Sequence, residues 1–225
     1  MSARRKHAAG YTLVELIIAG ALLIIVAGGA LRASLRGLEL FRTNSANADV
    51  NARSGRAIER IMRELVSAGG LTLDPALTLT PPLPTPWASS LEFRSASTWT
   101  AGALVWGDLR RIAWQLGGGE LANDADDDGD GLIDEGDIVL TEDVGGANER
   151  SVVLVTGVAE LLVGELPNGL DDNGNGMVDE AGLCFDRTGG TLNVRVTLER
   201  LAPQRQAILS RTLEDSLRLR NGLTP

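Results

Sequence analysis

The chain opens with a long apolar run that passes into a helical pattern. Residues 11–31 contain one charged side chain, Glu15. At about 1.5 Å per residue a helix of that length crosses a hydrocarbon core of about 30 Å, so the run predicts a membrane-spanning helix. The helical spacing then continues through Leu31, Leu35, Leu38, Ile58, Ile61, Met62 and Leu65. With no proline before Pro75 and with Gly69-Gly70 as a stop signal, one helix is expected over residues 11–68. Residues 11–31 form its transmembrane half, and residues 32–68 form an amphipathic continuation.

The hydrophobic pattern changes from helical spacing to alternation after residue 69. A proline-rich connector covers residues 80–86, which cannot form a central strand. Alternating or short apolar runs then predict strands at residues 90–95, 111–116, 138–140, 152–155, 159–166, 191–199 and 208–219. The expected fold class is therefore α+β: a long N-terminal helix packed on an antiparallel sheet formed by residues 69–225.

The charge is distributed unevenly. The chain has a formal net charge of −9, and residues 1–10 contribute +3 through Arg4, Arg5 and Lys6, which leaves −12 on residues 11–225. An acidic body of this kind argues against nucleic acid as a partner, since binding to phosphates needs clustered Lys and Arg. Cations are the partners that such a surface favours.

Few residues are suited to nucleophilic or general base catalysis. The single histidine, His7, lies in the basic leader, and the sequence has no Gly-x-Ser-x-Gly motif. The single cysteine, Cys184, excludes an intrachain disulfide and is expected to be a small buried apolar residue. We therefore expect a protein that is not an enzyme, with no catalytic residues.

Three interpretations compete for the N-terminal segment. A secretory signal peptide has a shorter apolar region and places its small residues after that region, whereas Ala8, Ala9 and Gly10 precede it here. A simple membrane anchor needs no acidic residue, and an ionisable group within a spanning helix usually marks a function. The third interpretation is a prepilin signal. The order of basic residues, Gly10, an aromatic residue, Thr-Leu and Glu15 resembles the signal of type IV pilins and type II secretion pseudopilins.

This resemblance implies a processing site and an assembly contact. Prepilin peptidase would cleave between Gly10 and Tyr11 on the cytoplasmic side, and the new amino group of Tyr11 would be methylated. Glu15 would pair with the amino terminus of a neighbouring pilin or pseudopilin. The leader, residues 1–10, marks the N-terminal side as cytoplasmic by the positive-inside rule, so the body would be periplasmic on a single-pass inner-membrane anchor.

The size and order of the elements resemble those of the J-type minor pseudopilins of type II secretion and of minor type IV pilins, which implies a pilin-like fold. The type II secretion interpretation is preferred and the type IV pilus interpretation stays open. A pilus-tip adhesin would be favoured by an exposed aromatic patch of Trp87, Trp99 and Trp106. A metal-dependent, membrane-anchored hydrolase ranks last.

Two acidic segments, residues 123–137 and 168–182, repeat one pattern at an offset of 45 residues. Oxygen-bearing side chains recur at loop positions 1, 3 and 5, glycine follows at 6, an apolar residue stands at 8 and aspartate at 9. This spacing suits a calcium loop, in which position 7 contributes a backbone carbonyl. The predicted ligands are Asp126, Asp128, Asp130, Leu132, Asp134, Glu135 and Asp137 in the first loop, and Asp171, Asn173, Asn175, Met177, Asp179 and Glu180 in the second.

The loops resemble those of EF-hands and thrombospondin type 3 repeats but lack glutamate at position 12, where Asp137 and Gly182 stand. Glu135 or Glu180 is the candidate replacement. Oxygen-only donors favour Ca²⁺, so two Ca²⁺ sites are expected on hairpin ends of the sheet, the first binding more tightly because it carries more charge. The alternative is a pair of solvated acidic turns.

Overall fold

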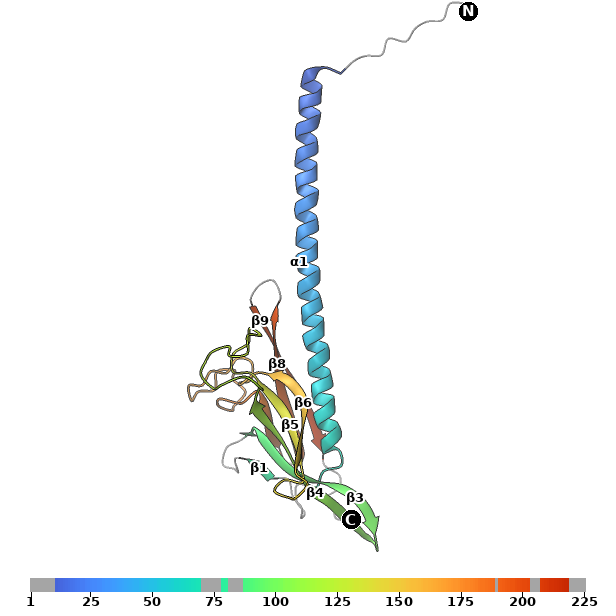
Figure 1. Cartoon of the computed structure of the whole chain (residues 1–225), viewed down its shortest axis with the longest axis vertical. Coiled ribbons are helices and arrows are strands. Elements are labelled where there is room, and N and C mark those ends of the chain that lie inside the picture. Colours follow the sequence, from blue (N-terminus) through green and yellow to red (C-terminus); the bar gives the residue numbers. More distant parts are fainter. Residues whose placement is uncertain (1–10, 70–77, 81–86, 189, 203–206, 219–225) are drawn as a thin grey trace, which may run out of the picture. The chain divides into compact units, whose positions relative to one another are not determined.

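The computed structural model describes residues 11–69, 78–80, 87–188, 190–202 and 207–218 (Figure 1). Within these ranges there are one helix and nine strands. The elements are α1 (Leu13–Leu65), β1 (Thr78–Thr80), β2 (Trp87–Ala88), β3 (Ser90–Thr100), β4 (Ala103–Leu116), β5 (Gly136–Glu142), β6 (Arg150–Val158), β7 (Leu183–Thr188), β8 (Thr191–Ala202) and β9 (Ala207–Arg218). All strand pairs are antiparallel, which confirms the α+β class.

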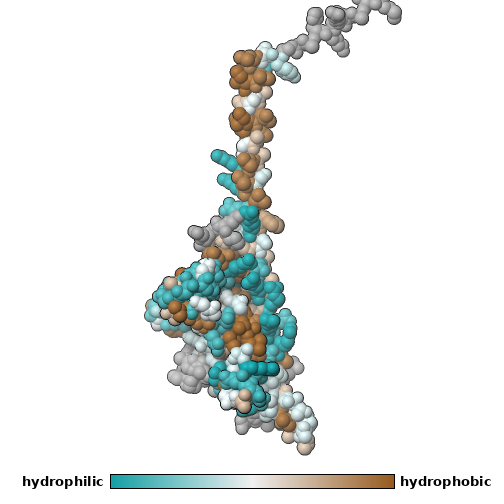
Figure 2. Space-filling model, viewed as in Figure 1, coloured by the Kyte–Doolittle hydropathy of each residue, from teal (hydrophilic) through white to brown (hydrophobic). Residues whose placement is uncertain are grey.

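The chain divides into two compact units, Met1–Ser45 and Ala46–Pro225. In the first unit, α1 is long and apolar enough to cross a membrane. Its apolar side chains are exposed, among them Leu16, Ile17, Leu22, Leu23, Ile24 and Ile25. Figure 2 shows this part of the helix as mostly hydrophobic. A helix of this length and composition is compatible with a single-pass membrane anchor. The predicted leader, residues 1–10, and most of the proline-rich connector lie outside the described residues.

In the second unit, the last turns of α1 supply one side of the hydrophobic core. The buried positions are Ala46, Val50, Ser54, Ala57, Ile58, Ile61 and Leu65, and Met62 is partly buried. They pack on inward-facing residues of the sheet that include Leu91, Phe93, Ile112, Ile138, Phe185 and Val194. The predicted stripe of Ile58, Ile61, Met62 and Leu65 is therefore confirmed as core. Cys184 is also buried, as expected.

The helix ends earlier than predicted, at Leu65 rather than at residue 68. The chain after Leu65 pairs with β3 instead: the amide of Ala96 donates to the carbonyl of Ser67 at 2.7 Å, and the amide of Gly69 donates to that of Arg94 at 2.9 Å. Two strand-type hydrogen bonds to a neighbouring element fix the exit of the helix, which the glycine signal alone could not place.

The sheet follows the order β1-β3-β4-β5-β6-β8-β7-β2. β9 pairs with β8 along its whole length. β6 and β7 both pair with the opposite edge of β8, and β6 does so through one residue pair, Val158 with Leu198. The prediction of a strand at residues 159–166 is wrong. Only a single bridge, between Leu161 and Ala181, forms there, because this segment leads into the second acidic loop. β7, which was not predicted, takes the place beside β8.

The two acidic loops start from neighbouring strand ends. Leu116, the last residue of β4, pairs with Gly136, the first residue of β5, and Gly136 also pairs with Val158, the last residue of β6. The first loop therefore closes a β4–β5 hairpin, as expected. The second loop joins β6 to β7, which follow each other along one edge of β8, so the expectation of a hairpin is wrong for this loop.

Gly182, which stands at position 12 of the second loop, has no space for a side chain. A Cβ atom there would lie 1.8 Å from the carbonyl oxygen of Ala159. The backbone of Gly182 also bonds twice, donating to the Glu160 carbonyl at 2.7 Å and accepting from the Thr197 amide at 2.8 Å. The close approach of β6, β7 and β8 thus explains why no glutamate occupies this position.

We predict that G182A lowers the free energy of unfolding by about 2–3 kcal/mol, since the added methyl group overlaps backbone that cannot move away. G55A is the matched control, because a Cβ at Gly55 meets nothing within 4 Å and alanine suits a helix better, which should stabilise the protein by about 0.5–1 kcal/mol. Chemical denaturation of both variants in detergent measures the two changes. Equal stability of G182A and the wild type would contradict the crowding at this position.

Candidate functional site

The N-terminal candidate residues form a capping box at the start of α1. Thr12 is the residue before the helix, and its backbone amide and its hydroxyl both donate to Oε2 of Glu15, at 2.9 and 3.0 Å. The amide of Glu15 donates in return to the Thr12 hydroxyl at 3.2 Å. This reciprocal pair satisfies amides that the first helical turn leaves without partners. Thr-x-x-Glu therefore sets the helix start at Leu13, two residues later than predicted. Tyr11 is exposed and non-helical, and Gly10 lies outside the described residues.

The two acidic loops have almost the same internal hydrogen bonds. In the first, both oxygens of Asp126 accept amides, from Gly129 at 2.7 Å and from Gly131 at 3.0 Å. Asp171 does the same in the second, for Gly174 at 2.6 Å and Gly176 at 2.8 Å. Gly131 and Gly176 both have a φ of 90°, in the left-handed region that glycine tolerates. The sequence repeat is therefore also a repeat of local structure.

Asp134 and Asp179, which were predicted as ligands or as holders of a bound water, close their loops in this structure. The two oxygens of Asp134 accept the amides of Asn123 and Asp124, at 3.2 and 2.8 Å. Asp179 likewise accepts the amides of Asn168 and Gly169, both at 3.1 Å or less. These carboxylates fasten the end of each loop to its beginning.

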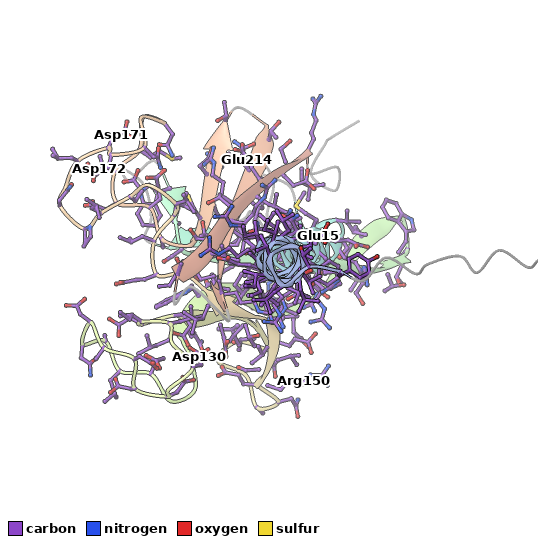
Figure 3. All side chains as sticks on the ribbon, turned by 90° about the horizontal axis from the view of Figure 1, so that it is seen from above. Glu15, Asp130, Arg150, Asp171, Asp172 and Glu214 are labelled. Carbon is purple, nitrogen blue, oxygen red and sulfur yellow. The ribbon has the colours of Figure 1, made fainter. Side chains whose placement is uncertain are left out.

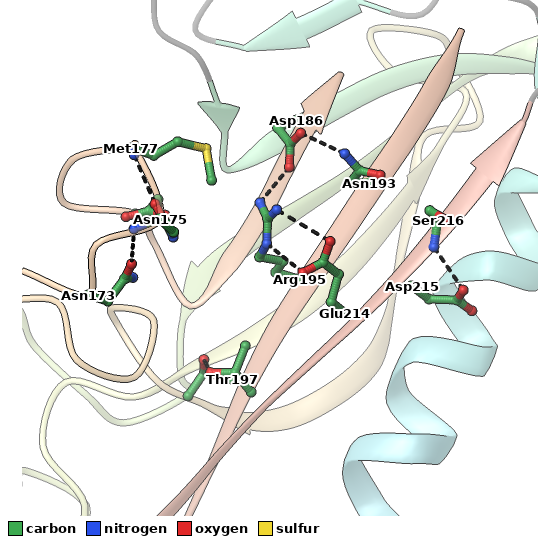
Figure 4. Close-up of polar contacts among 12 residues, drawn as sticks. Asn173, Asn175, Met177, Asp186, Asn193, Arg195, Thr197, Glu214, Asp215 and Ser216 are labelled. Atoms are coloured by element: carbon green, nitrogen blue, oxygen red, sulfur yellow. Dashed lines mark hydrogen bonds and ion pairs between the residues drawn. The ribbon is translucent and has the colours of Figure 1, made fainter. Parts of the chain in front are cut away.

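Leu132 and Met177, at position 7, are buried, while Ile133 and Val178, at position 8, are about half exposed. The position-7 side chains thus anchor the loops to the body. The amide of Leu132 donates to the side chain of Asp130 at 2.9 Å. The amide of Met177 donates to the side chain of Asn175 at 2.8 Å, as Figure 4 shows.

A glutamate before each loop was missed by the sequence analysis. Glu120 and Glu165 are both buried, with 6% of their surface exposed, and their Oε1 atoms accept the amides of Asp128 and Asn173 at 3.0 and 3.1 Å. They stand at the same offset of 45 residues and follow glycines, Gly119 and Gly164, at that same offset. Extending the repeat toward its N-terminal side would have found them.

The two loops differ in the hydrogen bonds that their buried glutamates accept. In the second loop, Oε2 of Glu165 accepts the amide of Asp179 at 3.1 Å, and the side-chain amide of Asn175 donates to Oε1 of Glu180. In the first loop, position 5 is Asp130, which cannot donate in this way. Among the described residues, the buried side-chain oxygens without a hydrogen-bond partner are Oε2 of Glu120, Glu135 and Glu180.

Carboxylates gather closely only in the first loop, as far as the described residues go. Oxygens of Glu120, Asp126 and Asp128 lie within 4.8 Å of one another, and so do oxygens of Asp128, Asp130 and Glu135. Asp128 belongs to both groups. The structure therefore brings together four predicted ligands and adds Glu120. In the second loop the equivalent positions hold Asn173 and Asn175, beside Asp171 and Glu180. Figure 3 shows the two loops from above, with Asp130 on one and Asp171 and Asp172 on the other.

A cavity of about 450 Å³ adjoins the first loop. Asp128, Asp130, Glu135 and Asp137 line one part, and Arg53, Glu199 and Arg200 line another. Asp137, predicted as a ligand, lies on β5 and reaches this cavity instead of the two carboxylate groups. The arginines are already paired with Asp49 of α1, Arg53 at 3.1 Å. Within the described parts of the chain, no Lys or Arg forms an ion pair with an acidic loop.

Burial and mutual repulsion raise several pKa values here. Burial raises the pKa of Glu135 to about 7, and the charges of Asp130, Glu120 and Asp128 add to this effect. Burial also raises the pKa values of Asp137 and Glu199. Burial raises the pKa of Glu160, and the negative charges of Asp134 and Asp124 in the first loop raise it further. Protonation of these carboxyl groups, or binding of a cation, would therefore reduce the repulsion in this region.

The three tryptophans considered for an adhesive surface do not share one exposed patch. Trp99, near the β3–β4 turn, is 68% exposed. Trp87 and Trp106 are partly buried, and the indole of Trp87 donates to the carbonyl of Val178 in the second loop at 2.9 Å. Trp87 thus connects β2 to a loop.

A search against protein-family models, curated proteins and solved structures finds no match for this chain.

Proposed function

We propose that this chain is a structural subunit of a membrane-anchored filament, a minor pseudopilin of type II secretion or a minor type IV pilin. It is processed by prepilin peptidase, assembled through its N-terminal helix, and stabilised in its periplasmic body by Ca²⁺. The observation that carries the proposal is the segment from Gly10 to Glu15 at the head of an apolar helix.

The geometry of the N-terminus supports this proposal. The expected cleavage point lies two residues before α1, and Tyr11, on its C-terminal side, is exposed and non-helical, which suits entry into a protease site. Thr12 uses one oxygen of Glu15, Oε2, for both of its hydrogen bonds. A neighbouring amino terminus therefore has the other oxygen, Oε1, to bind.

The acidic loops support the calcium part of the proposal. They contain closely spaced carboxylates, buried oxygens without partners and oxygen-only donors, which together suit a hard divalent cation. A pilin-like subunit and a calcium-stabilised body are separable claims, so each has its own test.

For the processing claim, co-expression with a prepilin peptidase should yield a chain that begins at a methylated Tyr11. Intact-mass spectrometry of the purified protein measures the terminus. G10V is the control and should keep its leader, because the larger side chain blocks cleavage after residue 10. A wild-type chain that retains Met1 in the presence of active peptidase would contradict the prepilin assignment.

For the calcium claim, thermal unfolding of the full chain in detergent should shift upward when Ca²⁺ is added after chelation. At a free concentration of about one hundred times the dissociation constant, the stabilisation is about 2.7 kcal/mol, or roughly 5–10 °C for a domain of this size. Mg²⁺ at equal concentration should shift the transition less, since it sheds its bound water reluctantly. An unchanged transition, with no calcium in the protein by elemental analysis, would refute calcium stabilisation.

Deleting the gene in its own organism separates the two machines. Loss of secreted proteins from the medium, with surface filaments retained, identifies type II secretion. Loss of surface filaments with secretion retained identifies a type IV pilus. If both are retained, the chain is not required by either machine.

A further inference from the structure

The two acidic loops share a backbone structure but not a charge balance. Residues 120–135 carry eight acidic side chains and residues 165–180 carry five, with no basic residue in either segment. The hydrogen bonds described above are otherwise nearly the same. The loops therefore differ in what neutralises their carboxylates. The difference is greatest at the glutamates that stand before and after each loop.

We propose that the first loop is the tight cation site of this protein and that Glu120 and Glu135 are ligands, together with Asp126, Asp128 and Asp130. Asp134 closes the loop and belongs to neither of the two close carboxylate groups, so it stays outside the ligand set. This inference deepens the calcium part of the proposed function and rests on it.

Burial is the first argument. Glu120 and Glu135 are each 6% exposed, and one oxygen of each has no partner. A buried carboxylate oxygen without a hydrogen bond or counter-ion destabilises the folded state, so native proteins seldom leave one unpaired. Two such oxygens in one loop, both beside other carboxylates, need a positive charge between them.

The positions of the oxygens supply the second argument. Glu120 is within 4.8 Å of Asp126 and Asp128, and Glu135 is within 4.8 Å of Asp128 and Asp130. Because Asp128 belongs to both groups, the two groups adjoin each other at this residue. Calcium accepts six to eight oxygens in flexible arrangements, and the cavity beside Asp128, Asp130 and Glu135 admits the water that completes such a shell.

The second loop is an internal comparison that already contains a substitute for the ion. There the amide of Asn175 donates to Glu180, and Glu165 accepts two backbone amides, from Asn173 and Asp179. Replacing Asp130 and Asp128 by Asn175 and Asn173 removes two charges and supplies a neutral donor. The second loop keeps one buried oxygen without a partner, Oε2 of Glu180, where the first loop keeps two. It is therefore closer to self-sufficient, and its affinity for the cation is lower.

Calcium titration of the full chain in detergent, followed by calorimetry, tests the assignment with matched pairs from the repeat. E120Q and E135Q should each raise the dissociation constant of the tight site by about tenfold or more, because affinity depends on the number of charged ligands. E165Q and E180Q, at the equivalent positions, should leave that constant within about twofold.

Thermal unfolding of the calcium-free variants separates a ligand from a structural residue. E120Q should unfold at a higher temperature than the wild type, since it removes a buried, repelled charge while its amide oxygen can still accept from Asp128. D134N should unfold at a lower temperature, because it weakens the acceptors for the amides of Asn123 and Asp124. Opposite signs for these two variants support the proposed roles.

Each other outcome overturns the inference in a distinguishable way. If the wild type binds Ca²⁺ but E120Q and E135Q bind it equally well, the glutamates are not ligands, while calcium stabilisation stands. If E165Q and E180Q weaken the tight site instead, the tight site is the second loop. If the wild type binds no Ca²⁺, the calcium part of the proposed function fails as well. If D134N behaves like E120Q, Asp134 belongs to the ligand set.

Discussion

The body of this protein depends on the contact between the last turns of α1 and the sheet. The buried face of the helix is formed by small residues at Ala46, Ser54 and Ala57 and by larger ones at Ile61 and Leu65. The larger residues lie where β3, β4, β5 and β7 contribute Phe93, Ile112, Ile138 and Phe185 to the core. Ser54 can be buried in this face because its hydroxyl donates to the carbonyl of Val50 at 2.8 Å. One face of the helix thus packs against strands that are distant from one another in the sequence.

The same packing decides where the acidic loops can be. Charged loops cannot enter a core that the helix already covers, so they are found at strand ends, where β4, β5 and β6 meet in one row of paired residues. Gly136 and Gly182 lie at these points, where a side chain would overlap neighbouring atoms, so the chain can pass closely beside the adjacent segments. The bracketing glutamates, the position-7 residues and Asp134 are the buried side chains that hold the loops to the body. The loops are therefore fixed to the body at a few buried points and otherwise exposed, an arrangement in which a cation can enter from solvent.

Much of this architecture follows from local pattern. Alternation and short apolar runs located six of the strands, and the stripe of Ile58, Ile61 and Leu65 marked the buried helix face. What could not be predicted depends on contacts between distant segments. The end of α1 is set by pairing of residues 67–69 with β3, and β7 forms because β8 offers an edge beyond β6. The acidic repeat was visible, but the role of Asp134 was not, since its partners are backbone amides about ten residues away. Glu120 lies outside a calcium-loop template and was found by its burial.

The two loops of the repeat differ in how far their own side chains compensate the buried carboxylates. The loop with Asn at positions 3 and 5 supplies a donor of its own, from Asn175 to Glu180. A loop with Asp at these positions accumulates charge that the protein does not neutralise, and burial of Glu120 and Glu135 increases the cost. If the first loop binds a divalent cation as proposed, its folding is coupled to the free concentration of that cation, because any ligand of the native state is stabilising. In the proposed topology the body reaches such a cation only on the far side of the membrane from its synthesis. Under these conditions the first loop would fold completely only after translocation, whereas the second loop would keep its structure before the cation is met.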